Sequence, residues 1–63
     1  MDSALIEEIL EHDRRGATIL FGRTSYGRTK VKVKFGPWHL LTRRYYPDNQ
    51  TYAALKDRIR RSL

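Results

Sequence analysis

The sequence predicts a single α+β domain in which a helix, a three-stranded antiparallel meander and a second helix follow one another. Three patterns predict it: a helical apolar repeat over 3–14, alternation of apolar and basic residues over 29–35, and a helical repeat over 49–62. Because 63 residues allow only one small domain, we expect residues 1–63 to form one unit with both helices on one face of the sheet.

The first predicted helix covers residues 3–14 and carries one apolar stripe. The residues of the stripe recur at helical spacing, with glutamates outside it: Leu5, Ile6, Ile9 and Leu10. Asp2 or Ser3 is suited to cap the first turn, and Gly16 is suited to end the helix.

Three stretches rich in β-forming residues follow, over 17–23, 29–35 and 38–46. The middle stretch alternates two kinds of residue, Lys30, Lys32 and Lys34 with Val31, Val33 and Phe35. Successive side chains of a strand point to opposite faces, so this stretch predicts one apolar and one basic face.

Turn residues predict the pairing of the first two strands. A three-residue loop over 25–27, with Gly27 at positive φ, is a common hairpin connection. It places Phe21 opposite Val31 and Ile19 opposite Val33, so that apolar residues meet on one face. The same pairing places Ala17 opposite Phe35.

A two-residue loop at Gly36-Pro37 predicts the pairing of the second and third strands. On the apolar face it pairs Phe35 with Trp38, Val33 with Leu40 and Val31 with Thr42. On the basic face it pairs Lys34 with His39, Lys32 with Leu41, Lys30 with Arg43 and Arg28 with Tyr45. Each apolar residue of the central strand then faces an uncharged partner, which favours this register.

The last predicted element is a helix over 49–62. Pro47 interrupts the preceding strand, and Asp48 and Asn49 are suited to cap a helix. The apolar stripe of this helix consists of Tyr52, Leu55, Ile59 and Leu63. Since both helices are amphipathic, we expect them to cover the apolar face of the sheet.

The net charge of +6 is unevenly distributed along the chain. Residues 1–13 carry five acidic and no basic side chains, hence −5, whereas residues 14–63 carry all thirteen Lys and Arg with two Asp, hence +11. Such asymmetry is typical of proteins that bind polyanions or acidic partners, or that associate with themselves.

The exposed face of the central strand is the predicted functional surface. The residues expected on it, or beside it on the third strand, are Arg28, Lys30, Lys32, Lys34, His39, Arg43 and Tyr45. Cations at this spacing suit the phosphate backbone, and tyrosines such as Tyr45 and Tyr26 suit stacking on unpaired bases. We therefore expect a small nucleic-acid-binding module that contacts phosphates or single strands.

Two other interpretations of the basic face remain open. It also suits docking of an acidic protein, or of the acidic first helix of another copy in a homo-oligomer. Lysines on an exposed strand also occur simply as solvated residues that limit aggregation. Arg44 alternates away from this face, so we expect it to point inward toward an acidic residue such as Glu11.

The residues do not indicate catalysis, a cofactor or a metal. The two histidines, His12 and His39, are far apart in the predicted fold, cysteine is absent, and the serines lie in turns or near the chain ends. A nucleophile with a base and an orienting group cannot be assembled from them. Two separate histidines without clustered carboxylates also predict no metal site. We expect a protein that is not an enzyme and needs no cofactor.

The hydropathy pattern predicts no contact with a membrane. The longest aliphatic or aromatic run is Ile19-Leu20-Phe21, far short of the roughly 18 residues of a membrane span. No apolar segment follows Met1, and the chain lacks cysteine. We therefore expect a cytoplasmic location.

The α-β-β-β-α order with basic residues is similar to double-stranded-RNA-binding domains and to HicA-type mRNA interferases. The interferases carry a Gly-Ser-His motif on the first hairpin, where this chain has Thr24-Ser25-Tyr26. The resemblance therefore implies RNA binding without the catalytic histidine. Residues 30–35 and 52–55 also look like the start of a Phox-and-Bem-type interaction domain, which implies a strand lysine binding an acidic partner.

Overall fold

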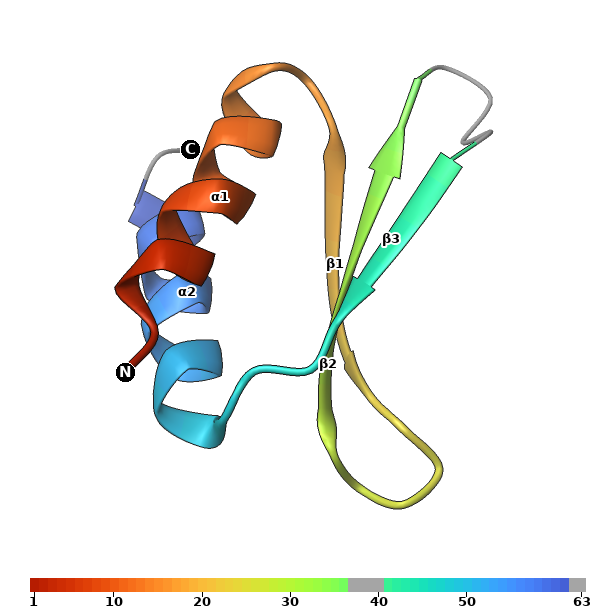
Figure 1. The fold of residues 1–63 in the computed structure, drawn as a ribbon, viewed down its shortest axis with the longest axis vertical. Coiled ribbons are helices and arrows are strands. Elements are labelled where there is room, and N and C mark those ends of the chain that lie inside the picture. Colours follow the sequence, from red (N-terminus) through yellow and green to blue (C-terminus); the bar gives the residue numbers. More distant parts are fainter. Residues whose placement is uncertain (37–40, 62–63) are drawn as a thin grey trace.

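The computed structural model describes residues 1–36 and 41–61. The elements follow in the order α1 (Ser3–Arg14), β1 (Thr18–Arg23), β2 (Thr29–Phe35), β3 (Leu41–Tyr45) and α2 (Asn49–Arg61). The strands form one antiparallel sheet in the order β1-β2-β3, and both helices lie on the same side of it (Figure 1). The predicted α+β fold class is confirmed. The predicted third strand and second helix extend partly into residues 37–40 and 62–63, outside the described residues.

Both helices begin at an aspartate whose side chain caps the first turn. The Asp2 carboxylate accepts a hydrogen bond from the Leu5 backbone N–H at 3.1 Å, and the Asp48 carboxylate accepts one from the Thr51 N–H at 2.6 Å. These bonds satisfy N–H groups that have no partner within the helix. After α1, Gly16 adopts a φ of +93°, as expected for a residue that ends a helix.

The core lies between the two helices and the centre of the sheet. Its buried apolar residues come from α1, β2 and α2: Ile6, Ile9, Leu10, Val31, Val33 and Leu55. A buried threonine joins the two helices, because Thr51 Oγ1 accepts a hydrogen bond from the Asp2 backbone N–H at 3.0 Å. β2 is therefore the strand that both amphipathic helices help to bury.

The first hairpin has the predicted register. Phe21 pairs with Val31 and Ile19 with Val33. Gly27 adopts a φ of +83°, and the Thr24 N–H donates to the Arg28 carbonyl at 2.8 Å to close the three-residue loop. The loop thus orients the apolar side of β1 toward the core.

The predicted register of the second hairpin is wrong. Val33 pairs with Arg43 rather than with Leu40, and Val31 pairs with Tyr45 rather than with Thr42. The shift of three residues is an odd number, so it reverses the face of every β3 side chain. Trp38, His39 and Leu40, the partners expected nearest the turn, lie outside the described residues.

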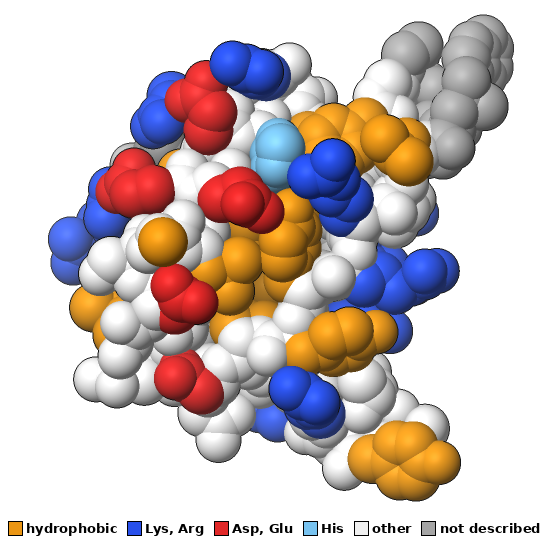
Figure 2. All heavy atoms as spheres, in the orientation of Figure 1, with side chains coloured by type: hydrophobic (Ala, Val, Ile, Leu, Met, Phe, Trp, Pro, Cys, Tyr) orange, Lys and Arg blue, Asp and Glu red, His pale blue; other side chains and the backbone are white. Residues whose placement is uncertain are grey.

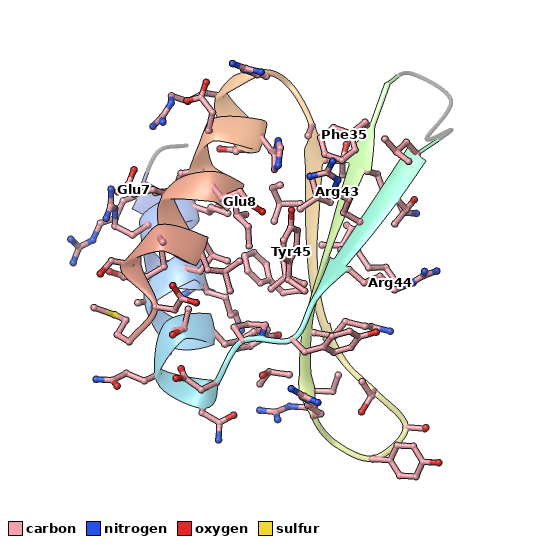
Figure 3. The ribbon with its side chains drawn as sticks, viewed as in Figure 1. Glu7, Glu8, Phe35, Arg43, Arg44 and Tyr45 are labelled. Carbon is pink, nitrogen blue, oxygen red and sulfur yellow. The ribbon has the colours of Figure 1, made fainter. Side chains whose placement is uncertain are left out.

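The reversal places Tyr45 and Arg43 on the side of the sheet that faces the helices, and Arg44 on the opposite side (Figure 3). The Tyr45 ring packs against the core, and the Arg43 guanidinium lies 5.9 Å from the centroid of the Phe35 ring. The prediction that Arg44 points inward toward Glu11 is therefore also wrong. Burial of the large Tyr45 ring favours the observed register over one that would bury Thr42.

The structure also bears on membrane insertion. Within residues 1–36 and 41–61, neither helix combines the length and the apolarity that crossing a bilayer requires.

Candidate nucleic-acid interface

Four basic side chains lie on the face of the sheet that the helices leave uncovered. Lys30, Lys32 and Lys34 alternate along β2 with the buried valines, and Arg44 of β3 pairs directly with Lys32. We call these four residues the basic sheet face. Their neighbours on the same face are small or uncharged: Thr18, Leu20 and Gly22 on β1, and Thr42 on β3.

The remaining predicted site residues are distributed differently from the sequence prediction. Arg43 and Tyr45 lie on the helix-facing side and do not join the basic sheet face. His39 lies outside the described residues. Arg28 immediately precedes β2, and its guanidinium lies 5.2 Å from the centroid of the Tyr46 ring. The sequence prediction missed Arg44 and Tyr46, and only a different loop length in the second hairpin would have revealed them.

Like charges dominate the electrostatics of this face. The pKa of Lys32 is lowered below its usual value of 10.5, first by the charge of Lys30 and then by partial burial, Arg44 and Lys34. Within the described part of the chain, none of the four cations forms an ion pair with a carboxylate. No carboxylate of the described residues therefore neutralises these charges.

The helical layer is electrostatically different, because its charges pair with one another. Acidic side chains gather over this layer in Figure 2. Glu11 binds Arg14 at 2.7 Å and Arg15 at 3.0 Å, and both bonds contribute to lowering the pKa of its carboxyl. Glu7 lies 3.9 Å from Arg58 of α2. Two of the five acidic residues of positions 1–13, Glu7 and Glu11, are thus already paired within the molecule.

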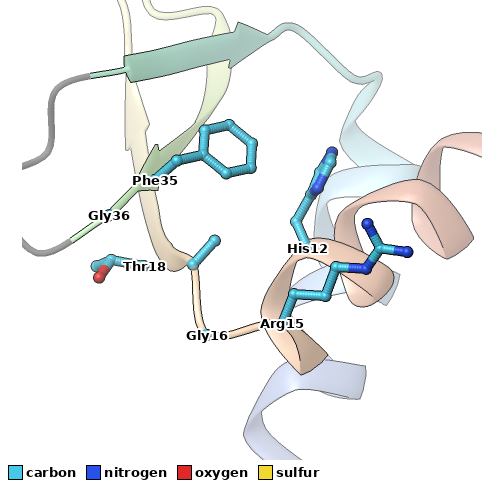
Figure 4. Close-up of a pocket in the computed structure, with 7 residues that line it drawn as sticks. His12, Arg15, Gly16, Thr18, Phe35 and Gly36 are labelled. Carbon is cyan, nitrogen blue, oxygen red and sulfur yellow. The ribbon is translucent and has the colours of Figure 1, made fainter.

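A hollow lies where the end of α1 meets the sheet, and its lining includes His12, Arg15, Thr18, Phe35 and Gly36 (Figure 4). The His12 ring contacts the Phe35 ring edge-on, with centroids 4.9 Å apart, and its buried Nε2 has no hydrogen-bond partner among the described residues. The Arg15 guanidinium is already bonded to Glu11.

The Tyr45 hydroxyl is a second buried polar group near α1. It makes no hydrogen bond within the described residues, although Glu8 and Arg43 are close enough to affect its ionisation. Burial, with a smaller contribution from Glu8, raises the pKa of Tyr45 above 10.0. This hydroxyl stays protonated at neutral pH and faces the helices, so it is not available to a ligand on the basic sheet face.

The described residues contain no cluster of three His, Asp or Glu side chains able to hold a metal ion. No family model, curated protein or solved structure matches this chain. Function is therefore inferred from the geometry and charge of the basic sheet face.

Proposed function

We propose that this chain is a small nucleic-acid-binding module that contacts the phosphate backbone through its basic sheet face. One observation carries the proposal: Lys30, Lys32, Lys34 and Arg44 share an exposed face on which no described carboxylate neutralises them. Several cations of the helical layer, Arg14, Arg15, Arg58 and Arg61, pair with carboxylates, whereas these four are available to an external polyanion.

The spacing of the lysines supports a backbone ligand. Alternate residues of a strand lie about 6.6–6.8 Å apart, comparable with the separation of neighbouring phosphates along an extended strand. Each phosphate that a cation neutralises releases condensed counterions, which makes affinity fall with salt concentration. A row of three lysines with an arginine beside it thus suits contact with successive phosphates of one strand. Such contacts do not depend on the identity of the bases.

The alternative of self-association through the acidic helix is less favoured by the contacts. Glu7 and Glu11 of α1 are already engaged by Arg58, Arg14 and Arg15. Docking α1 onto the basic sheet face of another copy would require these ion pairs to exchange partners, with little net gain in charge pairing.

Two neighbouring arginines provide a matched test. Arg43 and Arg44 occupy the same strand and carry the same charge, but they lie on opposite faces of the sheet. Labelled RNA and DNA oligonucleotides, single-stranded and duplex, would be titrated across a salt series with wild type, Arg43→Gln and Arg44→Gln. We expect Arg44→Gln to reduce the slope of log K against log salt by about 0.7–0.9, as for one lost phosphate contact. Arg43→Gln should leave the slope unchanged.

Three results would contradict the proposal: no binding at low salt, affinity independent of salt, or equal losses in both arginine variants. Thermal unfolding of each variant shows whether a loss comes from the fold. A concentration-dependent oligomer in size-exclusion chromatography, abolished by Glu7→Lys with Glu8→Lys and Glu11→Lys, would instead support self-association.

A further inference from the structure

A cleft opens between the tip of the first hairpin and the segment that joins β3 to α2. Its lining includes Tyr26 and Arg28 from the hairpin side, and Tyr46, Asp48 and Asn49 from the other side. In Figure 1 the hairpin tip lies at the lower end of the molecule, and the segment that joins β3 to α2 crosses above it. Arg28 directly precedes β2 and lies two residues before Lys30, so the cleft adjoins the end of the basic sheet face.

Tyr26 is the most exposed large apolar side chain of the described residues, with 97% of its surface accessible. Its backbone is nevertheless well held. Thr24 Oγ1 accepts hydrogen bonds from the Tyr26 N–H at 3.2 Å and the Arg28 N–H at 3.1 Å, and the Gly27 N–H donates to the Thr24 carbonyl at 2.9 Å. An aromatic ring presented to solvent by an ordered turn is a ready stacking platform, because little backbone entropy is lost when it binds.

The lining of the cleft includes a second aromatic residue, Tyr46. The Arg28 guanidinium lies 5.2 Å from the Tyr46 ring centroid, within the range of a cation–π contact, and its Nη2 lies 3.5 Å from the Tyr46 carbonyl oxygen. Both planar groups offer surfaces on which another planar group can stack. Tyr46 is itself 44% exposed.

Asp48 determines which part of a nucleic acid suits this cleft. Hydrogen bonds from the Thr51 N–H and hydroxyl lower the pKa of its carboxyl, so it is ionised at neutral pH. An ionised carboxylate repels phosphate but accepts hydrogen bonds from the exocyclic amino groups of adenine, cytosine or guanine. Asp48 therefore favours a base over a phosphate at its own end of the cleft, whereas Arg28 and the adjoining lysines suit phosphates.

We propose that the exposed Tyr26 ring beside this cleft is a stacking subsite for one unpaired nucleobase, in a strand whose phosphates follow the basic sheet face. This inference rests on the proposed function and adds its ligand class: nucleic acid with unpaired bases rather than a continuous duplex. A paired base is stacked within its helix and cannot enter such a cleft without being flipped out.

The test uses a short DNA oligonucleotide containing 2-aminopurine, whose fluorescence changes on stacking, alone and annealed to its full complement. A stacked base is worth about 1–3 kcal/mol, so Tyr26→Ala should weaken single-strand binding about 5- to 150-fold. Tyr26→Phe should retain single-strand affinity, because the ring is kept. Ser25→Ala, at the adjacent turn position, is the matched control and should bind as wild type does. For the duplex, Tyr26→Ala should change affinity by less than about twofold.

The outcomes separate this subsite from the proposed function. If wild type binds neither this DNA nor the RNA oligonucleotides used to test the proposed function, both inferences fail. If binding is salt-dependent but Tyr26→Ala has no effect, or affects single strand and duplex equally, the subsite is wrong and the basic sheet face stands. Loss confined to the single strand, with loss of the 2-aminopurine signal, supports the subsite.

Discussion

Lys32 of β2 and Arg44 of β3 lie directly opposite each other on the uncovered face of the sheet. Like charges in this position destabilise a sheet, and Lys30 and Lys34 flank the pair on the same strand. The lowered pKa of Lys32 reflects this crowding of positive charge. The folded protein therefore retains a repulsion that a bound polyanion would remove.

The first prediction concerns the stability cost of this repulsion. Arg44→Gln should raise Tm by about 1–3 °C at low salt, because one like charge is removed from opposite Lys32. The gain should shrink in about 1 M salt, where screening is strong. Thermal unfolding by circular dichroism at both salt concentrations measures it. Arg43→Gln is the control and should give no gain; an absent gain for Arg44→Gln at low salt would contradict the prediction.

The same charge cluster predicts an alkaline effect of defined sign. The folded-state pKa of Lys32 is below the unfolded value of 10.5, so the unfolded state binds more protons between the two values. Repulsion at Lys32 is thus fully present at neutral pH and is relieved as pH rises through the lowered pKa toward 10.5. Urea unfolding of wild type and Lys32→Gln, measured from neutral pH to about pH 10.5, isolates this effect. The free energy of unfolding should rise with pH through the Lys32 titration in wild type, and this rise should be absent from the variant.

The cap of α2 predicts how stability falls in acid. Hydrogen bonds from Thr51 hold the Asp48 pKa below its usual 3.8, so the carboxylate stabilises the fold above that pH. The stabilisation is lost as pH falls through the lowered folded-state pKa. Asp48→Asn should flatten the acid part of the stability curve, measured by urea unfolding from about pH 2 to about pH 6.

The buried Tyr45 hydroxyl predicts that its removal does not destabilise the fold. Because it has no hydrogen-bond partner in the described part of the chain, Tyr45→Phe should leave the free energy of unfolding unchanged or raise it by up to about 1 kcal/mol at neutral pH. The folded-state pKa of Tyr45 is raised above 10.0. The stability linked to a protonated hydroxyl is therefore fully present below pH 10.0 and is lost as pH rises through the folded-state pKa. Tyr45→Phe should remove that alkaline loss. A large destabilisation at neutral pH would show that the hydroxyl is bonded, and Glu8, which influences its pKa, would be the acceptor to test.

Two glycines predict opposite effects of the same substitution. Gly27 has a φ of +83°, so Gly27→Ala should destabilise the fold by about 1–2 kcal/mol through backbone strain. Gly22 lies within β1 without positive φ, and a Cβ there would meet nothing within 4 Å. Gly22→Ala should therefore stabilise by about 0.4–1 kcal/mol, since it restricts the unfolded chain. Chemical denaturation measures the free energy of unfolding of both variants. Equal changes in this free energy would be inconsistent with the turn geometry.

Much of the architecture could be predicted from the sequence because its local signals agree. Apolar periodicity identified both helices, and the alternation in 29–35 identified the central strand with its lysines outward. The first register was predictable because Gly27 restricts the loop and a slip would place Phe21 opposite Lys30. Three of the predicted site residues therefore lie where the alternation indicated: Lys30, Lys32 and Lys34.

The third strand offered no comparable signal. Its segment alternates two mixed sets, one with Thr42 and Arg44 and one with Arg43 and Tyr45, so hydropathy alone does not identify an inner face. The assumption of a two-residue loop then selected the wrong set. This error exchanged Arg43 and Tyr45 for Arg44 in the candidate site.

The sequence by itself determined the fold class, the unequal charge of the two chain segments and the outward lysines of β2. Only the tertiary structure decided which face of β3 joins them, because that choice depends on packing the Tyr45 ring beside α1. It also decided which charges stay unpaired, since Glu7 meets Arg58 only when α1 and α2 come together. Periodicity along one strand is a local property, whereas register at a sheet edge is determined by long-range burial.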